Sequence, residues 1–166
     1  MFATKFYEIV RALVEERVDF IVIGGFAAAL QGAPLATYDV DIVHSTEPSN
    51  VARLLKALEA LDAYYRLQPE RRLRPAESHL SSAGHQLLMT RFGMLDCLGS
   101  AGAGRGYAEL LRHSSELDVR GARIRVLDLE TIIALKEELG GEKDSGALPT
   151  LRRTLEETRK RRGDLR

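Results

Sequence analysis

The chain has 166 residues, of which 24 are Lys or Arg and 24 are Asp or Glu, so its formal net charge is zero. This balance removes any whole-chain argument for nucleic-acid binding, and the length is typical of one domain with a hydrophobic core of its own. The single cysteine, Cys97, excludes an intramolecular disulfide and any zinc site built on several cysteines.

No segment of the sequence predicts a place in or across a membrane. No apolar run reaches the roughly 18 residues that a membrane-spanning helix needs. Polar and acidic residues occur too early in residues 1–8 for a signal peptide. We therefore expect a cytoplasmic protein.

Strand and helix patterns alternate along the first half of the chain, which predicts an α/β (α+β) domain. Apolar residues recur at helical spacing up to Arg17, and an apolar run rich in β-branched residues follows. In chain order, we expect a helix over 2–17, a strand over 20–23, a short helix over 26–30, a strand over 39–43 and a helix over 48–61. Residues 66–84 are polar, contain prolines and lack periodicity, so they predict a loop or an irregular crossover.

The second half continues with shorter strands and two longer helices. Phe92-Gly93 separates two apolar segments that predict a hairpin. The glycine-dense segment 99–106 lacks the spacing of a dinucleotide-binding loop, so we expect a flexible loop or flap. The remaining elements are expected as a short helix over 107–111, two strands over 117–126 that turn at Gly121, a helix over 129–136 capped by Asp128, and a basic helix carrying Leu148, Leu151 and Leu155. We expect one domain over residues 1–166, with a core over about 1–127 and C-terminal helices over about 128–163.

A pair of glycines, Gly24 and Gly25, lies between the first predicted strand and the short helix that follows it. Backbone N–H groups at the start of a helix carry partial positive charge, and the absence of Cβ atoms lets an anion approach the backbone closely. The pair therefore predicts a turn that binds phosphate.

Two carboxylates occur two residues apart in the next predicted strand. On a β-strand, Asp39 and Asp41 point to the same face, with Cα atoms about 6.5–7 Å apart. Without a cation these charges would repel each other, so an adjacent divalent ion is the simplest way to keep both ionised. Oxygen ligands of this kind suit Mg²⁺ or Mn²⁺.

Two further charged side chains are candidates for the same site. Asp96 lies on a strand that we expect to be largely buried, and its neighbour Cys97 is expected to point the opposite way into the core. Lys136 lies on the apolar face of its predicted helix, where it would either meet an anion such as a triphosphate or extend along the helix edge into water. Of the four histidines, only His44 is expected near the site.

Together, the glycine pair, Asp39-x-Asp41 and Asp96 resemble the nucleotidyltransferase superfamily of the DNA polymerase β type. More narrowly, the chain resembles small bacterial nucleotidyltransferases associated with toxin–antitoxin and abortive-infection loci. The resemblance extends over roughly residues 5–155. It follows, in order, the segments 23–32 and 36–42, then 129–136, and finally Lys143-Asp144.

The resemblance implies a nucleotidyltransferase fold, in which helices flank a small mixed sheet and the C-terminal part is helical. It also implies metal-dependent transfer of a nucleoside monophosphate from an NTP to a hydroxyl on RNA or on a cognate partner protein, with release of pyrophosphate. Asp39, Asp41 and Asp96 would hold two Mg²⁺ or Mn²⁺ ions, and Asp96 would help to take the hydroxyl proton. The residues that would contact the nucleotide are Gly24, Gly25, Thr37, Lys136 and Lys143.

Other functions remain open at this point. Leu35 stands where many members of the family carry an arginine, so one alternative is a catalytically weakened binding module or antitoxin that binds nucleotide or a partner protein. A plain α/β scaffold with surface carboxylates is another. Among acceptors, RNA would engage the arginines of residues 66–74 and the basic last helix on one face, a partner protein would present a tyrosine or serine, and an antibiotic would need a deep pocket. The base preference and the oligomeric state do not follow from the sequence.

Overall fold

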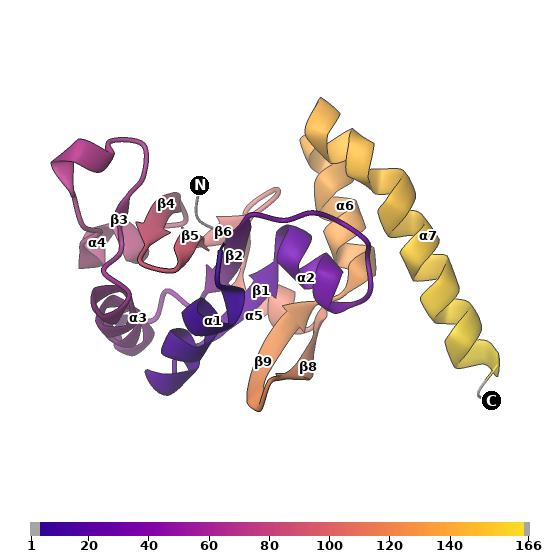
Figure 1. Ribbon diagram of the computed structural model, residues 1–166, viewed down its shortest axis with the longest axis horizontal. Coiled ribbons are helices and arrows are strands. Elements are labelled where there is room, and N and C mark those ends of the chain that lie inside the picture. Colours follow the sequence, from indigo (N-terminus) through magenta and orange to yellow (C-terminus); the bar gives the residue numbers. More distant parts are fainter. Residues whose placement is uncertain (1–3, 165–166) are drawn as a thin grey trace.

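The computed structural model describes residues 4–164, with the side chains of residues 142–144 outside the described part. A seven-stranded mixed sheet has the order β3-β4-β5-β2-β1-β9-β8, and β6 and β7 form a separate two-stranded sheet (Figure 1). The strands are β1 (Phe20–Ile23), β2 (Asp39–His44), β3 (Tyr64–Tyr65), β4 (His85–Thr90), β5 (Gly93–Leu98), β6 (Ser100–Ala101), β7 (Arg105–Gly106), β8 (Ser114–Val119) and β9 (Ala122–Leu127). The helices are α1 (Phe6–Glu15), α2 (Gly24–Leu30), α3 (Pro48–Ala60), the 3₁₀ turn η1 (Pro69–Arg71), α4 (Glu77–Leu80), α5 (Tyr107–Leu111), α6 (Leu129–Leu139) and α7 (Glu142–Asp164).

The strand order places β2 in the middle of the sheet, between β1 and β5. β1 pairs antiparallel with β2 and parallel with β9, whereas β2 and β5 run parallel. Parallel strands need a long crossover connection, and here α3, β3, α4 and β4 lie between the two in sequence. The parallel register sets Asp39 opposite Met94 and Asp41 opposite Asp96.

A large part of the hydrophobic core lies against the face of β2 and β5 that is opposite the aspartates. Val40 and Ile42 alternate with the two aspartates of β2 and are fully buried, as is Cys97 on β5, as predicted. Because successive side chains of a strand point to opposite faces, the same alternation directs Asp39 and Asp41 away from this core. The core residues that α1 and α3 contribute include Ile9, Leu13, Leu54 and Leu58.

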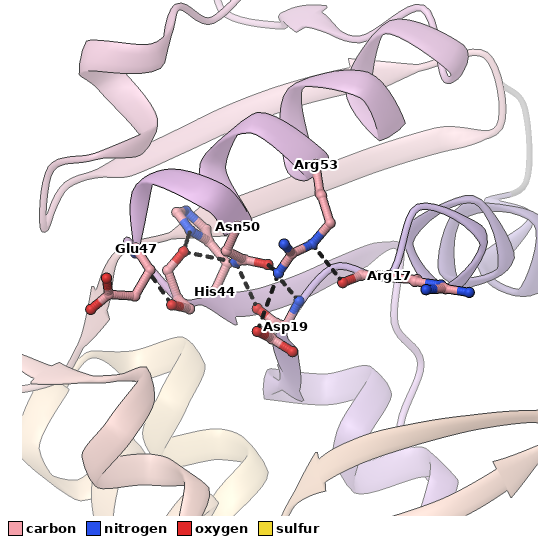
Figure 2. Close-up of polar contacts among 7 residues, drawn as sticks. Arg17, Asp19, His44, Glu47, Asn50 and Arg53 are labelled. Atoms are coloured by element: carbon pink, nitrogen blue, oxygen red, sulfur yellow. Dashed lines mark hydrogen bonds and ion pairs between the residues drawn. The ribbon is translucent and has the colours of Figure 1, made fainter.

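A buried asparagine in the first turn of α3 fixes the end of β2 that lies away from the aspartates. Asn50 Oδ1 accepts a hydrogen bond from the backbone N–H of Asp19 at 2.7 Å, and its Nδ2 donates to the carbonyls of Asp19 and Ser45 at 3.1 and 2.8 Å. Arg53 donates to Asn50 Oδ1 at 3.3 Å and to the carbonyl of Arg17 at 3.0 Å (Figure 2). These bonds satisfy a buried amide and join the segment before β1 to the segment after β2, which supports the β1–β2 register.

Most predicted elements are present, and the differences concern short ones. Residues 66–84 contain η1 and α4, which the sequence pattern did not predict because elements this short show no periodicity. Residues 99–106, expected to be a flexible loop or flap, contain the hairpin β6–β7. Arg105 of this hairpin forms an ion pair with Glu138 of α6, so the hairpin is joined to that helix.

Helices α6 and α7 pack together at the end of the molecule opposite β3 and η1 (Figure 1). Asp128 caps α6 as predicted, because its Oδ1 accepts from the N–H of Thr131 at 2.9 Å. Gly140 ends the helix with a φ of 61°. Among the described helices, none has both the length and the hydropathy needed to cross a membrane.

Candidate active site

Three aspartates converge where β2 and β5 lie side by side. Asp39, Asp41 and Asp96 each offer a carboxylate oxygen, and these three oxygens all lie within 4.8 Å of one another. Asp41 and Asp96 are direct partners in the parallel register, and Asp39 lies two residues earlier on the same face of β2. The structure thus brings together the three carboxylates that the sequence singled out.

The surroundings of Asp41 favour its protonated form. Burial, the charges of Asp39 and Asp96 and a hydrogen bond with Asp96 together raise the pKa of Asp41 to about 8, while the Arg66 guanidinium acts in the opposite direction. A carboxyl group in so negative a place keeps its proton unless a cation compensates for the charge. A divalent ion with oxygen ligands is such a cation, so the donor set fits Mg²⁺ or Mn²⁺.

The two glycines are packed closely against this site. Gly24 has a φ of 68°, and a Cβ atom built on it would lie 2.5 Å from Oδ2 of Asp41. A Cβ atom on Gly25 would lie 3.1 Å from Oγ1 of Thr37, whose hydroxyl donates to the carbonyl of Asp39 at 3.3 Å. Both the backbone conformation and the approach of Asp41 therefore require glycine at position 24.

A cavity of about 220 Å³ opens beside the carboxylates, between the sheet, the β6–β7 hairpin and α6. Its polar lining includes four predicted site residues, Gly24, Asp41, Asp96 and Lys136. Its apolar lining includes Leu87, Leu98, Ala101, Ile132 and Leu135. Lys136 therefore lies on the cavity side of α6, whereas the side chain of Lys143, the other predicted lysine, lies outside the described residues.

Solved structures with a similar fold cover almost the whole chain. They include TM1012 from Thermotoga maritima, a proposed nucleotidyltransferase (TM-score 0.58, 19% identity, covering 95% of this chain and 96% of that one). The lincomycin-bound lincosamide adenylyltransferase LnuA aligns with a TM-score of 0.60 at 14% identity, over 92% of this chain and 98% of its own. The antibiotic-resistance factor ANT(2'')-Ia aligns with a TM-score of 0.57 at 17% identity, over 96% of this chain and 92% of its own.

This chain has the nucleotidyltransferase fold. The predicted mixed sheet with flanking helices and a helical C-terminal part is thereby confirmed. No protein-family model matches the sequence, and no curated protein matches it either. The narrower resemblance to toxin–antitoxin nucleotidyltransferases stays a prediction.

The prediction for the histidines was wrong. His44 lies at the end of β2 away from the aspartates, where its Nδ1 contacts the carbonyl of Ser45 at 3.1 Å (Figure 2). His44 is three positions after Asp41, so it lies about 10 Å further along the strand and its side chain points to the opposite face of the sheet. His85 at the start of β4 lines the cavity instead, and its Nε2 contacts the carbonyl of Ser100 at 3.0 Å.

The presence of an arginine at the carboxylates was not predicted from the sequence. Arg66, directly after β3, forms an ion pair with Asp96 through two nitrogen–oxygen contacts, Nη1 to Oδ1 and Nη2 to Oδ2, the latter at 3.3 Å. Arg66 is the first residue of the segment 66–84, which was expected to be a loop or an irregular crossover. The candidate site thus contains a fixed positive charge, although Leu35 stands where the resemblance implies an arginine.

Proposed function

We propose that this protein is a metal-dependent nucleotidyltransferase that moves a nucleoside monophosphate from an NTP to an acceptor hydroxyl. The observation that carries the proposal is the convergence of Asp39, Asp41 and Asp96 beside Gly24, at a cavity that Lys136 also lines. Carboxylates, a lysine and a glycine turn are the groups that metal-assisted phosphoryl-type transfer uses. The fold supports the proposal, since LnuA is described as a lincosamide antibiotic adenylyltransferase and ANT(2'')-Ia as an antibiotic-resistance factor.

In the proposed reaction, the acceptor oxygen forms a bond to the α-phosphorus of the NTP. The bond from that phosphorus to the oxygen bridging the α- and β-phosphates breaks, and pyrophosphate leaves with the electron pair. Asp96 accepts the hydroxyl proton, and Lys136 neutralises charge on the phosphates. Asp39 and Asp41 would hold the divalent cation, which, when bound, withdraws charge from the phosphate oxygens. The further proposed nucleotide contacts are Gly25, Thr37 and Lys143.

A second groove, on the β3–β4 side of the aspartates, supports an anionic acceptor. It has a volume of about 420 Å³, and its lining includes Tyr64, Arg91 and Met94. Met94 is the register partner of Asp39, so the groove reaches the strand next to Asp39. We infer that the end of an RNA strand is the acceptor, with its hydroxyl directed toward Asp96.

The charges around this groove are the specific support for RNA. The Arg72 guanidinium lies 4.1 Å from the centre of the Tyr64 ring. Arg72, Arg74 and Arg91 all lower the pKa of Asp62, so three guanidinium groups gather around one exposed carboxylate. Cationic groups beside a partly exposed aromatic ring, as here at Tyr64, are typical of surfaces that bind single-stranded nucleic acid.

The basic last helix does not extend this surface. Figure 1 places α7 at the end of the molecule opposite β3 and η1, so the two basic segments do not form the single face that RNA transfer was expected to use. Two arginines of α7 also form ion pairs with α6, Arg152 with Glu137 and Arg159 with Glu130. The proposed RNA surface is therefore confined to the β3–β4 side.

Release of pyrophosphate from each of the four NTPs, with Mg²⁺ or Mn²⁺ and total RNA as the acceptor, tests the proposed activity. Asp39→Asn and Asp41→Asn should lower the rate at least a hundredfold, because each removes a negative ligand without changing the side-chain volume. Glu156→Gln is the matched control, since Glu156 is an exposed carboxylate of α7. Equal rates in all four proteins would exclude the assigned site, and nucleotide binding without turnover would favour the binding-module alternative.

The acceptor is tested separately with three candidates: an RNA oligonucleotide, a protein fraction from the same cell and tobramycin. RNA labelling should fall steeply with salt, and Arg91→Ala should weaken RNA binding with little effect on NTP binding. Labelling of a protein would instead favour a partner protein. Efficient labelling of tobramycin, a cationic aminoglycoside, would contradict an acceptor groove that Arg91 lines and Arg72 borders.

A further inference from the structure

Arg66 belongs to a row of residues that crosses the sheet from its edge to the candidate active site. The backbone N–H of Arg66 donates to the carbonyl of Leu87 at 3.1 Å. Leu87 is the register partner of Asp96, and Asp96 is the register partner of Asp41. Two strand spacings, about 10 Å, separate the Arg66 backbone from Asp96, and an extended arginine can cover most of that distance by passing over Leu87.

The guanidinium of Arg66 is fixed by Asp96 and by a backbone carbonyl. Nη1 and Nη2 approach the two oxygens of Asp96 separately, and Nη1 also lies 3.4 Å from the carbonyl of Leu88. The side chains of Arg66 and Asp96 are only 20% and 11% exposed. A paired arginine of this kind is pre-organised, and it stays charged at every accessible pH.

The charge of Arg66 has a consequence for metal binding. In a two-metal site, the third carboxylate would share a second divalent ion with the other two. Here a guanidinium already occupies both oxygens of that carboxylate, and its positive charge would repel a divalent ion bound nearby in a poorly solvated place. Asp39 and Asp41 have no such contact from Arg66 among the hydrogen bonds of the described residues.

We propose that Arg66 takes the place of a second metal ion at Asp96, so that the site binds one divalent cation, through Asp39 and Asp41. This inference rests on the metal dependence in the proposed function. Arg66 acts as a positioning residue, because it orients Asp96 and stabilises its negative charge. The lone pairs of Asp96 that Arg66 does not use remain available to accept a proton.

Counting bound Mn²⁺ in the absence of nucleotide tests this inference without any measurement of activity. The full chain is titrated with Mn²⁺ alone at pH 9, and free Mn²⁺ is measured by electron paramagnetic resonance. We expect one ion per wild-type chain and two per Arg66→Met chain, because Met keeps an unbranched apolar stem and removes the charge. Arg66→Lys should restore one ion, since it restores the charge without the forked contact.

Control variants separate this effect from a general loss of positive charge or of the site. Arg153→Met removes an exposed arginine of α7 and should leave the count at one. Asp39→Asn should weaken the remaining site at least tenfold. If Arg66→Met does not fold, as judged by circular dichroism, Arg66→Gln replaces it in the same titration.

Each outcome decides the inference. The inference is overturned if the wild-type chain binds two Mn²⁺ ions or none. It is also overturned if a folded variant without the Arg66 charge still binds only one. A change from one ion to two with no nucleotidyl transfer would support the role of Arg66 and reject the proposed function. Nucleotidyl transfer by a wild-type chain that binds two ions would support the proposed function and reject the role of Arg66.

Discussion

The raised pKa of Asp41 predicts that the metal-free protein loses stability as the pH rises from 6 to 9. The pKa of Asp41 is about 8 in the folded protein, against an ordinary value of 3.8. Between these values the folded chain binds one proton more than the unfolded chain, so raising the pH favours unfolding. The stabilisation is fully present below the lower value and is lost as the pH passes through about 8. Between pH 6 and the folded-state pKa of about 8 lie two pH units, so the free energy of unfolding should fall by about 2–3 kcal/mol over this range.

Thermal unfolding followed by circular dichroism in EDTA measures this effect. For a chain of this size the loss corresponds to a decrease in Tm of roughly 5–10 °C. Asp41→Asn should remove this part of the pH dependence, because an amide has no proton to release. Saturating Mn²⁺ should also reduce it in the wild type, because a cation stabilises the ionised carboxylate. Parallel pH curves for wild type and Asp41→Asn in EDTA would refute the reasoning.

Three other substitutions test the packing around the site and the core. Gly24→Ala should abolish most Mn²⁺ binding, because the added Cβ would collide with Asp41. Gly32 also has a positive φ, but a Cβ added there would meet no atom within 4 Å, so Gly32→Ala should lower only the stability. Lys136→Met should raise the KM for NTP roughly tenfold or more, through loss of a charged contact to phosphate, and an unchanged KM in steady-state kinetics would exclude that contact. Asn50→Ala should lower the free energy of unfolding by about 2–4 kcal/mol in urea, since it leaves several buried backbone groups unpaired, and a change below about 0.5 kcal/mol would contradict this role.

The carboxylate pair could be predicted because it depends only on strand periodicity. Alternation along β2 places Asp39 and Asp41 on one face whatever the neighbouring strands are. The apolar flanks of Asp96 likewise indicated a buried strand. Lys136 could be placed on the inner face of α6 from its spacing to Ile132, because helical periodicity extends over several turns.

Arg66 could not be predicted in the same way, because its contact depends on the register of three strands. β3 is only two residues long, so its segment has no period to detect. A shift of one residue in the pairing of β3 with β4 would turn the arginine to the other face. The same reason applies to Arg72, Arg74 and Arg91, which gather around Asp62 only through the fold.

The proposed activity has one direct test, the fate of the two ends of the triphosphate. Reactions with RNA and Mn²⁺ are run in parallel with NTP labelled at the α- or the γ-phosphate, using wild type and Asp41→Asn. Nucleotidyl transfer predicts label on the acceptor from the α-phosphate and label in pyrophosphate from the γ-phosphate, with both lost in the variant. Label on the acceptor from the γ-phosphate would mean phosphoryl transfer, and that result, or incorporation unaffected by Asp41→Asn, would contradict the function assigned to these carboxylates.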